Sequence, residues 1–176
     1  MNMEFKVGSK VFYPSHGAGI IKDKKEIEFD GQKRIYFEFE LVTNPLTIST
    51  PIENVESLGV RPVLSPNDIK KAIQILKKKP SVDPKVKDFN VILTIFKDLE
   101  NSADINDSVK IIQYCNFIKR NRKSEGRLIP ISIDKQLESA IKNIVGELAV
   151  SSGTDLQTAM KKFTQVTGIK YDIEND

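Results

Sequence analysis

The chain contains 176 residues, of which 39% are hydrophobic and 29% charged, a globular composition with room for one ordinary domain or two small ones. The sequence contains no run of 18 apolar residues, so no transmembrane helix is predicted. The first residues lack the basic segment followed by an apolar segment that is typical of a signal peptide. The single cysteine, Cys115, cannot form an internal disulfide, so we expect a cytoplasmic protein in which Cys115 is a buried structural thiol.

The charge is distributed unevenly along the chain, although the net charge is only +3. Residues 1–64 carry a net charge of −1, whereas residues 65–176 carry +4. Within the second part, the segments 65–97 and 110–127 each carry +5. Two basic patches on a nearly neutral protein indicate a modest nucleic-acid-binding surface, with a pair of solvated helix faces as the alternative.

The segment 5–64 has the pattern of short β-strands. Val7, Val11 and Tyr13 occupy alternate positions of an extended stretch that ends at Pro14. A glycine-rich corner follows. The chain can turn sharply there, because glycine adopts backbone angles that other residues avoid, and it re-enters the sheet as a second strand.

A two-residue hairpin turn is predicted at Asp30-Gly31, because glycine adopts positive φ easily. This turn joins a strand over 22–29 to a strand over 34–42. In the latter strand, alternation places four apolar side chains on one face, namely Ile35, Phe37, Phe39 and Leu41. Further strands are expected over 46–50 and 58–63. Five short strands in about 60 residues predict a small SH3- or Tudor-like β-barrel.

A helical pattern begins at Ser65-Pro66, where Ser65 is a good N-cap and Pro66 suits the first helical position. Five helices are expected. The first ends at Pro80, the second runs from residue 84 or 85 to 100, and the third begins at 104–107 and ends at Gly126. The fourth runs from Ser132 to about residue 150, and the fifth begins at the capping box Thr154-Asp155-Leu156-Gln157 and ends near Gly168. The predicted fold class is α+β, with a barrel domain over 1–64, an all-helical domain over 65–168 and a frayed tail over 169–176.

Several segments resemble a known family. The pattern F-K-V-G-x-x-V-x-Y-P-x-H-G, which begins at Phe5, is similar to the opening of the CarD/CdnL family of bacterial transcription regulators. Further matching segments follow in the same order: Leu46-Thr47-Ile48, Pro51-Ile52-Glu53-Asn54, Gly59-Val60-Arg61 and Val145-Gly146-Glu147-Leu148-Ala149. The resemblance spans about residues 5–165 and implies a polymerase-interaction domain followed by a DNA-binding domain.

In this family the barrel resembles the RNA polymerase-interaction domain shared with the transcription-repair coupling factor, which docks on the β subunit of the polymerase. Addition of a strand to an open sheet edge fits this contact physically. The resemblance implies that Lys25, Ile27, Ile48 and Ser49 contact RNA polymerase here. The family often has arginines in this region, where this chain has Ile27 and Ser49.

The helical domain resembles the family's DNA-binding domain, in which a Trp-Asn-Arg-Arg run touches promoter DNA beside the −10 element and the Trp is a minor-groove wedge. This chain has no Trp, and the matching run is Phe89-Asn90-Val91-Ile92. Phe89 is interpreted either as a wedge or as a core residue. The predicted DNA-binding residues are Lys85, Lys87, Phe89, Asn90 and Lys97, with a second cluster at Lys119, Arg120, Arg122 and Lys123. The alternative for this cluster is an ordinary solvated helix end.

The sequence offers little for catalysis. The single histidine, His16, lies in a predicted turn without the further ligands of a metal site or the partners of an activated nucleophile. No phosphate-binding glycine loop or dinucleotide fingerprint is present. We therefore predict a non-enzymatic protein without cofactor or metal, and without membrane contact.

The predicted function is transcription regulation. The barrel would bind the RNA polymerase β subunit, and the helical domain would contact promoter DNA weakly and non-specifically, stabilising the open complex. The alternatives are a polymerase-bound adaptor with little or no DNA binding and a Tudor-like module that binds RNA or a peptide. A hydrolase built on Cys115 and His16 is the least favoured interpretation.

Overall fold

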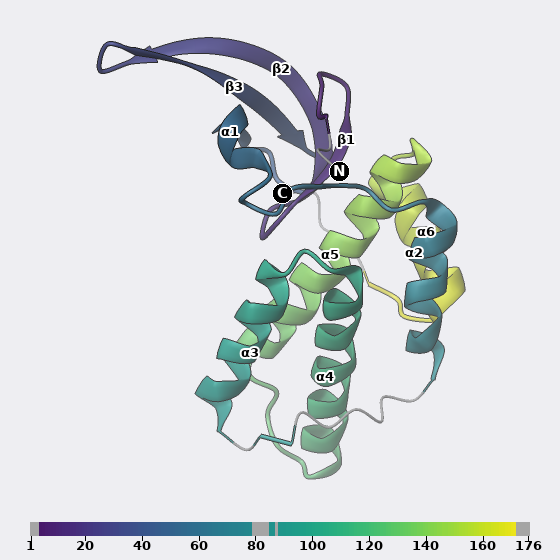
Figure 1. Cartoon of the computed structure of the whole chain (residues 1–176). Helices are drawn as coiled ribbons and strands as arrows, with labels where there is room; N and C mark the ends of the chain where they lie inside the picture. The colour runs from purple at the N-terminus through teal and green to yellow at the C-terminus, as the bar shows by residue number, and fades with distance from the viewer. Residues whose placement is uncertain (1–3, 79–84, 87, 172–176) are drawn as a thin grey trace.

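The computed structural model describes residues 4–78, 85–86 and 88–171. Within these residues the elements are β1 (Lys10–Tyr13), β2 (Gly17–Phe29), β3 (Gln32–Leu41), β4 (Thr47–Pro51), α1 (Ile52–Val55), β5 (Arg61–Pro62), α2 (Pro66–Ile73), the 3₁₀-helix η1 (Gln74–Lys77), α3 (Phe89–Asn101), α4 (Ile105–Ser124), α5 (Ile131–Ser152) and α6 (Leu156–Thr167). The strands form one antiparallel sheet in the order β4-β3-β2-β1-β5, and helices α2 to α6 follow it (Figure 1). The predicted α+β class is confirmed.

The longest strand pairing joins β2 to β3 across the predicted turn. Asp30 and Gly31 both have positive φ, 52° and 71°, the backbone that matches the twist of a tight hairpin. A register shift between Ile21 and Asp23 interrupts the ladder. Beyond the reach of β1 and β4, residues 26–35 project away from the rest of the molecule as a two-stranded arm (Figure 1).

The inner face of the sheet carries the barrel core, which consists of Val11, Ile21, Phe37, Phe39, Leu41, Val55 and Val60. Two predicted members lie outside this core. Ile35 is 42% exposed because it lies on the arm, beyond the last residue of β3 that pairs with β4. Val7 is 50% exposed because β1 begins only at Lys10. The alternation therefore predicts correctly which side chains face the core side of the sheet, but it does not predict where along each strand the core ends.

The end of the barrel differs from the strand predicted over 58–63. The short helix α1 follows directly after β4, and the chain then turns at Gly59, whose φ is +79°. Among the described residues only Arg61 and Pro62 pair with β1 as β5. Pro62 has no N–H to donate, which limits the ladder that this strand can form.

Side-chain caps set the starts of the first two long helices. Ser65 caps α2, as predicted, because its hydroxyl accepts a hydrogen bond from the Asp68 N–H. Asp88 caps α3, so this helix begins at Phe89 and not at the predicted residue 84 or 85. The predicted stop at Pro80 lies outside the described residues.

The caps of the last two helices differ from the predicted ones, by two residues for α5 and by one for α6. The cap of α5 is Pro130, whose backbone is extended, and Ser132 already lies inside the helix. The cap of α6 is Asp155 and not Thr154. The reason is that the Thr154 N–H donates to the Ala149 carbonyl oxygen and thereby closes the end of α5.

One apolar core joins the helices, and each of α2 to α6 contributes fully buried members, among them Ile69, Phe96, Ile111, Ile112, Cys115, Ile133, Ile141 and Phe163. The predicted burial of Cys115 is confirmed. Ile169 and Tyr171, in the segment predicted to be frayed, pack against this core, and residues 172–176 lie outside the described residues. No described helix is both long and apolar enough to cross a membrane.

Helix α5 connects the helices to the barrel. It packs against α4 and α6 and also against β2. A second, smaller apolar cluster fills the contact with the barrel and consists of Phe12, Ala18, Ala103 and Val150, with Val63 packed against it. Phe12 and Ala18 alternate with core residues along β1 and β2, so they lie on the outer face of the sheet. The outer face of β1 and β2 is therefore the surface that the helices cover.

Candidate functional site

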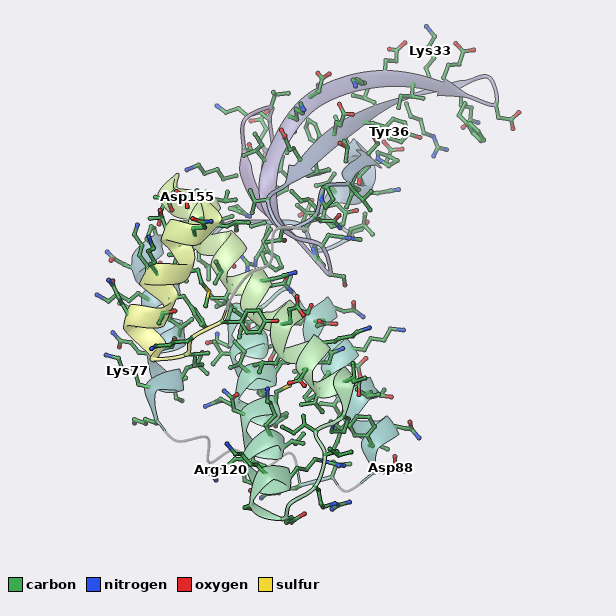
Figure 2. The ribbon with its side chains drawn as sticks, turned by 180° about the vertical axis from the view of Figure 1, so that it is seen from behind. Lys33, Tyr36, Lys77, Asp88, Arg120 and Asp155 are labelled. Atoms are coloured by element: carbon green, nitrogen blue, oxygen red, sulfur yellow. The ribbon has the colours of Figure 1, made fainter. Side chains whose placement is uncertain are left out.

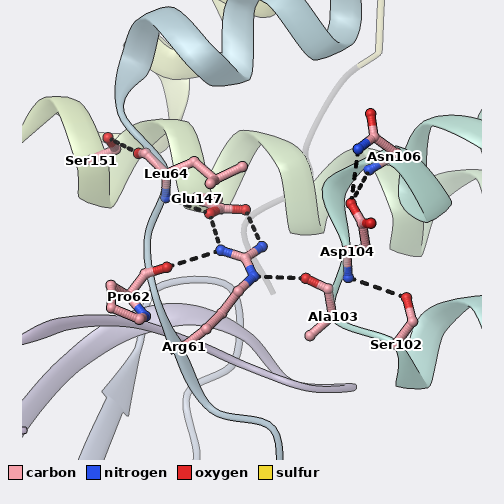
Figure 3. A network of polar contacts seen from close by, with 9 residues as sticks. All are labelled: Arg61, Pro62, Leu64, Ser102, Ala103, Asp104, Asn106, Glu147 and Ser151. Carbon is pink, nitrogen blue, oxygen red and sulfur yellow. Dashed lines mark hydrogen bonds and ion pairs between the residues drawn. The ribbon is translucent and has the colours of Figure 1, made fainter. Parts of the chain in front are cut away.

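A buried ion pair lies at the contact between the barrel and the helices (Figure 3). Glu147 of α5 is 1% exposed, and two nitrogens of Arg61 donate to it, Nη1 to Oε1 at 2.6 Å and Nη2 to Oε2 at 3.0 Å. The Leu64 N–H donates to the same Oε1 at 2.8 Å. Both carboxylate oxygens are thereby hydrogen-bonded, as a buried carboxylate requires.

The guanidinium of Arg61 also contacts three further groups. Its Nε donates to the Ala103 carbonyl oxygen at 2.7 Å, in the turn between α3 and α4. Its Nη1 also donates to the Pro62 carbonyl oxygen at 3.0 Å, and its central carbon lies 4.6 Å from the centroid of the Phe12 ring. A single side chain of the barrel therefore binds α5 and the α3–α4 turn at the same time.

Small residues let the barrel approach α5 closely. A Cβ atom on Gly146 of α5 would lie 2.8 Å from Thr43 Cγ2 of the barrel, and one on Gly17 of the barrel would lie 3.3 Å from Asn143 Oδ1 of α5. Ser151 Oγ donates to the Leu64 carbonyl oxygen at 2.5 Å. Larger side chains at either glycine would push the barrel and the helix apart.

The Arg61–Glu147 pair and these surrounding contacts are called the joint below. The joint brings together Gly59-Val60-Arg61 and Val145–Ala149, which the sequence analysis used only as parts of a family pattern. Their pairing was not predicted. A signal was present, because Glu147 is the single charged residue in the run Ile144–Val150, and a carboxylate within such an apolar helix segment needs a cationic partner.

The barrel also has open sheet edges. β4 pairs with β3 and with no other described strand, so its second edge is free. β2 pairs with β1 only over residues 17–20, so within the described part of the chain residues 22–29 have no strand partner on that side. Such edges carry N–H and C=O groups that can pair with a strand of another protein.

The four residues predicted to contact RNA polymerase lie on the strands that provide these edges. Lys25 and Ile27 belong to β2, and Ile48 and Ser49 belong to β4. By the register, Lys25, Ile27 and Ser49 face outward, whereas Ile48 lies opposite Phe39 on the inner face and is half-buried. The structure thus gathers three of the four on one face of the sheet and turns the fourth towards the barrel core.

An ion pair links the two strands on this outer face. Lys25 Nζ lies 2.8 Å from a carboxylate oxygen of Glu38 on β3, and Glu38 is paired with Ser49 on β4. The hydrogen bond to Glu38 raises the pKa of Lys25, so the Lys25 amine stays protonated over the whole physiological pH range. Lys25 is more than half exposed, so the charge remains available to a partner.

Apart from Lys97, which lies in the second half of α3, towards the contact of Asn101 with Ser15 of the barrel, the described residues predicted to bind DNA lie at the end of the helical half that is remote from the barrel. Figure 2 shows Asp88, the cap of α3, and Arg120 of α4 near this end, and Lys33 of the arm at the opposite end of the molecule. The start of α3 and the last turns of α4 are therefore at the same end, although they are separated in sequence.

The α3 residues of the predicted set differ in exposure. Phe89 is half-buried and packs against the helical core, which favours the core interpretation over the wedge. Asn90 and Lys97 are exposed, as is Lys85 ahead of the helix. Lys87 lies outside the described residues.

Two members of the α4 cluster make polar contacts within the protein. Lys119 Nζ lies 2.6 Å from the Asp134 carboxylate at the start of α5, and Arg122 Nη1 donates to the Leu128 carbonyl oxygen at 3.1 Å. The other two predicted residues of the cluster are exposed: Arg120 and Lys123. The basic end of α4 is thus partly a structural feature that holds the α4–α5 connection.

Cys115 and His16 lie in different environments. Burial raises the pKa of the Cys115 thiol to about 12, so it is not a thiolate at neutral pH. His16 is exposed in the corner between β1 and β2, where its backbone N–H donates to the Tyr13 carbonyl oxygen at 3.1 Å. Among the described residues, no group of three His, Cys, Asp or Glu side chains is placed to hold a metal ion.

Comparison with known proteins identifies the barrel. Residues 5–64 match the family described as the CarD-like/TRCF RID domain. The barrel is a CarD-like RID domain. The chain is also 24% identical over 149 residues to "Putative transcription factor YdeB" of Bacillus subtilis (strain 168), and the match covers 85% of this chain and 93% of that protein.

These matches divide the joint between two regions. Arg61 lies inside the RID domain, near the end of the matched range, whereas Glu147 lies well beyond it in α5. The similarity to the Bacillus subtilis protein is too long to fit within the RID domain and therefore includes helices.

Proposed function

We propose that this protein is a transcription regulator that binds the β subunit of RNA polymerase through its RID domain and contacts promoter DNA with its helices. The observation that carries the proposal is the match of residues 5–64 to the CarD-like/TRCF RID domain. The name of the Bacillus subtilis relative points in the same direction, because it too describes a transcription factor. The open edges of the RID sheet supply a physical mode of contact.

In the proposed contact, a strand of the β subunit pairs with an open edge of the RID domain. Main-chain hydrogen bonds would supply affinity, and side chains at alternate positions would supply specificity. On β4 the outward side chain is Ser49, next to the Lys25–Glu38 pair. A polymerase strand at this edge would therefore meet a small polar residue, with the exposed Lys25 and the half-buried Glu38 beside it on the same face.

The joint would let polymerase binding by the RID domain fix the position of the helices relative to the polymerase. Because Arg61 and Glu147 connect the RID domain to α5, helices carried by a bound RID domain would approach the promoter in a defined orientation. Tethering raises the effective concentration of the helices at the DNA, so weak contacts are sufficient to stabilise the open complex.

Proline substitutions at neighbouring positions of β4 test the strand contact. Alternate N–H groups of an edge strand point outward, so one of Ile48→Pro and Ser49→Pro removes an outward donor while the other breaks the ladder with β3. The full chain and both variants are used to pull down core RNA polymerase, with folding checked by circular dichroism. Lys142→Ala, on α5, is the control.

We expect the proline variant that keeps the barrel folded to lose most of its polymerase binding, while Lys142→Ala binds as the unmodified protein does. Equal recovery of polymerase by all folded variants would show that β4 is not the contact. Failure of the unmodified protein to recover polymerase at all would contradict the proposed function itself.

The adaptor alternative is favoured by one observation. Lys119 and Arg122, two cations of the predicted DNA-binding cluster, are engaged by Asp134 and by the Leu128 carbonyl oxygen. An adaptor would recover polymerase in the same experiment but show no salt-dependent binding to DNA, whereas the proposed regulator would show both.

A further inference from the structure

One flank of the helical half is crowded with lysines. The described segments 66–78 and 156–171, which contain α2, η1 and α6, hold seven lysines and a single acidic residue, Asp68. All seven lysines are exposed, and they are called the lysine surface: Lys70, Lys71, Lys77, Lys78, Lys161, Lys162 and Lys170. None of them belongs to the set that the sequence analysis assigned to DNA.

Helix packing brings these lysines together from segments far apart in the chain. α6 contacts both α2 and η1, and the two views show these elements along the same flank, with Lys77 close to α6 (Figures 1 and 2). The apolar sides of the helices face the core, because Ile69, Ile73 and Phe163 are almost fully buried. The lysines are therefore left on the outer side.

The protein itself does not neutralise this charge. Lys71 lies 3.8 Å from Asp68, and the other six lysines have no carboxylate partner among the described residues. Several lysines elsewhere on the surface do have such partners, as in the pairs Lys22–Glu40, Lys33–Glu26 and Lys142–Glu138. A group of unpaired cations raises the local positive potential and attracts a polyanion.

We propose that the lysine surface binds the phosphate backbone of duplex DNA. This inference rests on the proposed function and deepens it, because it assigns the DNA contact to α2, η1 and α6. A groove along α6 contains Lys161 and Lys170 together with Thr164 and Gln165. Hydroxyl and amide side chains beside lysines are the groups that commonly bind phosphate oxygens.

The composition of the flank favours duplex DNA over two other polyanionic partners. Single-stranded nucleic acid binds through stacking on exposed aromatic rings, but the aromatic residues of these segments are Phe163, which is buried, and Tyr171, which packs against the core. A membrane surface requires an exposed apolar row beside the cations. Here Ile75 is the exposed large hydrophobic residue of the flank, and the apolar rows of α2 and α6 are buried.

Three variants with the same loss of charge test the assignment. Each replaces three exposed cations with glutamine: Lys77, Lys161 and Lys162 on the lysine surface; Lys85, Arg120 and Lys123 at the remote end; and Lys22, Lys24 and Lys33 on the RID domain. Binding of the full chain to a mixed-sequence duplex of about 20 bp is measured by fluorescence anisotropy from about 50 to 200 mM KCl, without polymerase.

We expect the lysine-surface variant to flatten the slope of log K against log salt by about 2 to 3 units, since each phosphate contact contributes about −0.9. The remote-end and RID variants should change the slope by less than about one unit. The matched loss of charge ensures that a general electrostatic effect would appear equally in all three variants.

Three outcomes would overturn the inference. If the lysine-surface variant binds as the unmodified protein does while the remote-end variant loses binding, the DNA contact lies at α3 and α4 and the proposed function stands. If the unmodified protein shows no salt-dependent binding, the DNA part of the proposed function falls as well, whereas polymerase binding is scored separately in the pull-down. If the lysines support binding to vesicles with about 30% phosphatidylserine, or to double-stranded RNA, but not to duplex DNA, the partner is a different one.

Discussion

Replacing Arg61 with methionine tests the energetic weight of the joint. The substitution removes the charge and the donor fork but keeps an unbranched side chain. Glu147 would then remain 1% exposed without a cation and with one of its three hydrogen bonds, the one from the Leu64 N–H. Breaking a buried pair by removing one partner destabilises by about 3–5 kcal/mol. We expect Arg61→Met to lower the free energy of unfolding by that amount.

The double variant Arg61→Met/Glu147→Leu separates the buried charge from the other contacts. It leaves no uncompensated carboxylate. The Leu64 N–H loses its acceptor and the Ala103 carbonyl oxygen loses its Arg61 donor, so the expected loss is about 1–3 kcal/mol. The double variant should therefore be more stable than Arg61→Met alone. Urea denaturation followed by far-ultraviolet circular dichroism measures both.

A matched control is an exposed ion pair on the arm. Lys33 and Glu26 lie 3.1 Å apart and are both more than half exposed, so Lys33→Ala should change stability by less than about 1 kcal/mol. If Arg61→Met and the double variant unfold at the same urea concentration, or if Arg61→Met behaves like Lys33→Ala, then an unpaired Glu147 carboxylate does not destabilise the fold.

Further predictions concern the two cores and the division of the chain. Phe37→Ala should lower the free energy of unfolding by about 3–5 kcal/mol in urea denaturation, because Phe37 is 4% exposed, whereas Ile35→Ala on the arm should cost less than about 1 kcal/mol. The Cys115 thiol should resist iodoacetamide at pH 8 in the native protein and react in urea. Because burial raises its pKa to about 12, its contribution to stability should decline as pH rises from about 9 towards 12, and Cys115→Ala should lack this component of the decline. Residues 1–64 alone should give a dispersed NMR spectrum, because the barrel core lies within them; the spectrum of a disordered chain would contradict the domain boundary at Ser65.

Local features of the fold followed from the sequence. The hairpin turn at Asp30-Gly31 and the cap at Ser65 were predicted, because each depends on a few adjacent residues with special backbone or hydrogen-bonding properties. The burial of Cys115 was expected because a reactive thiol needs a cationic, exposed setting, and it is confirmed. Where neighbouring residues compete for the same role, the prediction was wrong by one position, as at Thr154 and Asp155.

Exposure at the ends of elements required the tertiary structure. Ile35 continues the alternation of Phe37 and is nevertheless exposed, because β4 stops short of it and the arm extends beyond the core. The exposure of Phe89 likewise required the tertiary structure. This residue is half-buried because of how α3 packs against its neighbours, and its place at the helix start does not predict that. Periodicity defines a face, but the neighbours that cover this face come from other parts of the chain.

Both candidate interaction features of the helical half depend on contacts between distant segments. Arg61 and Glu147 are 86 positions apart, and the lysine surface combines residues 70–78 with residues 161–170. The sequence determined that a carboxylate lies within an apolar helix segment and that lysines recur in α2, η1 and α6. Which cation meets that carboxylate, and which lysines share a surface, was decided by the packing of α5 and α6, because electrostatic interactions act over a few ångströms in space, whatever the separation along the chain.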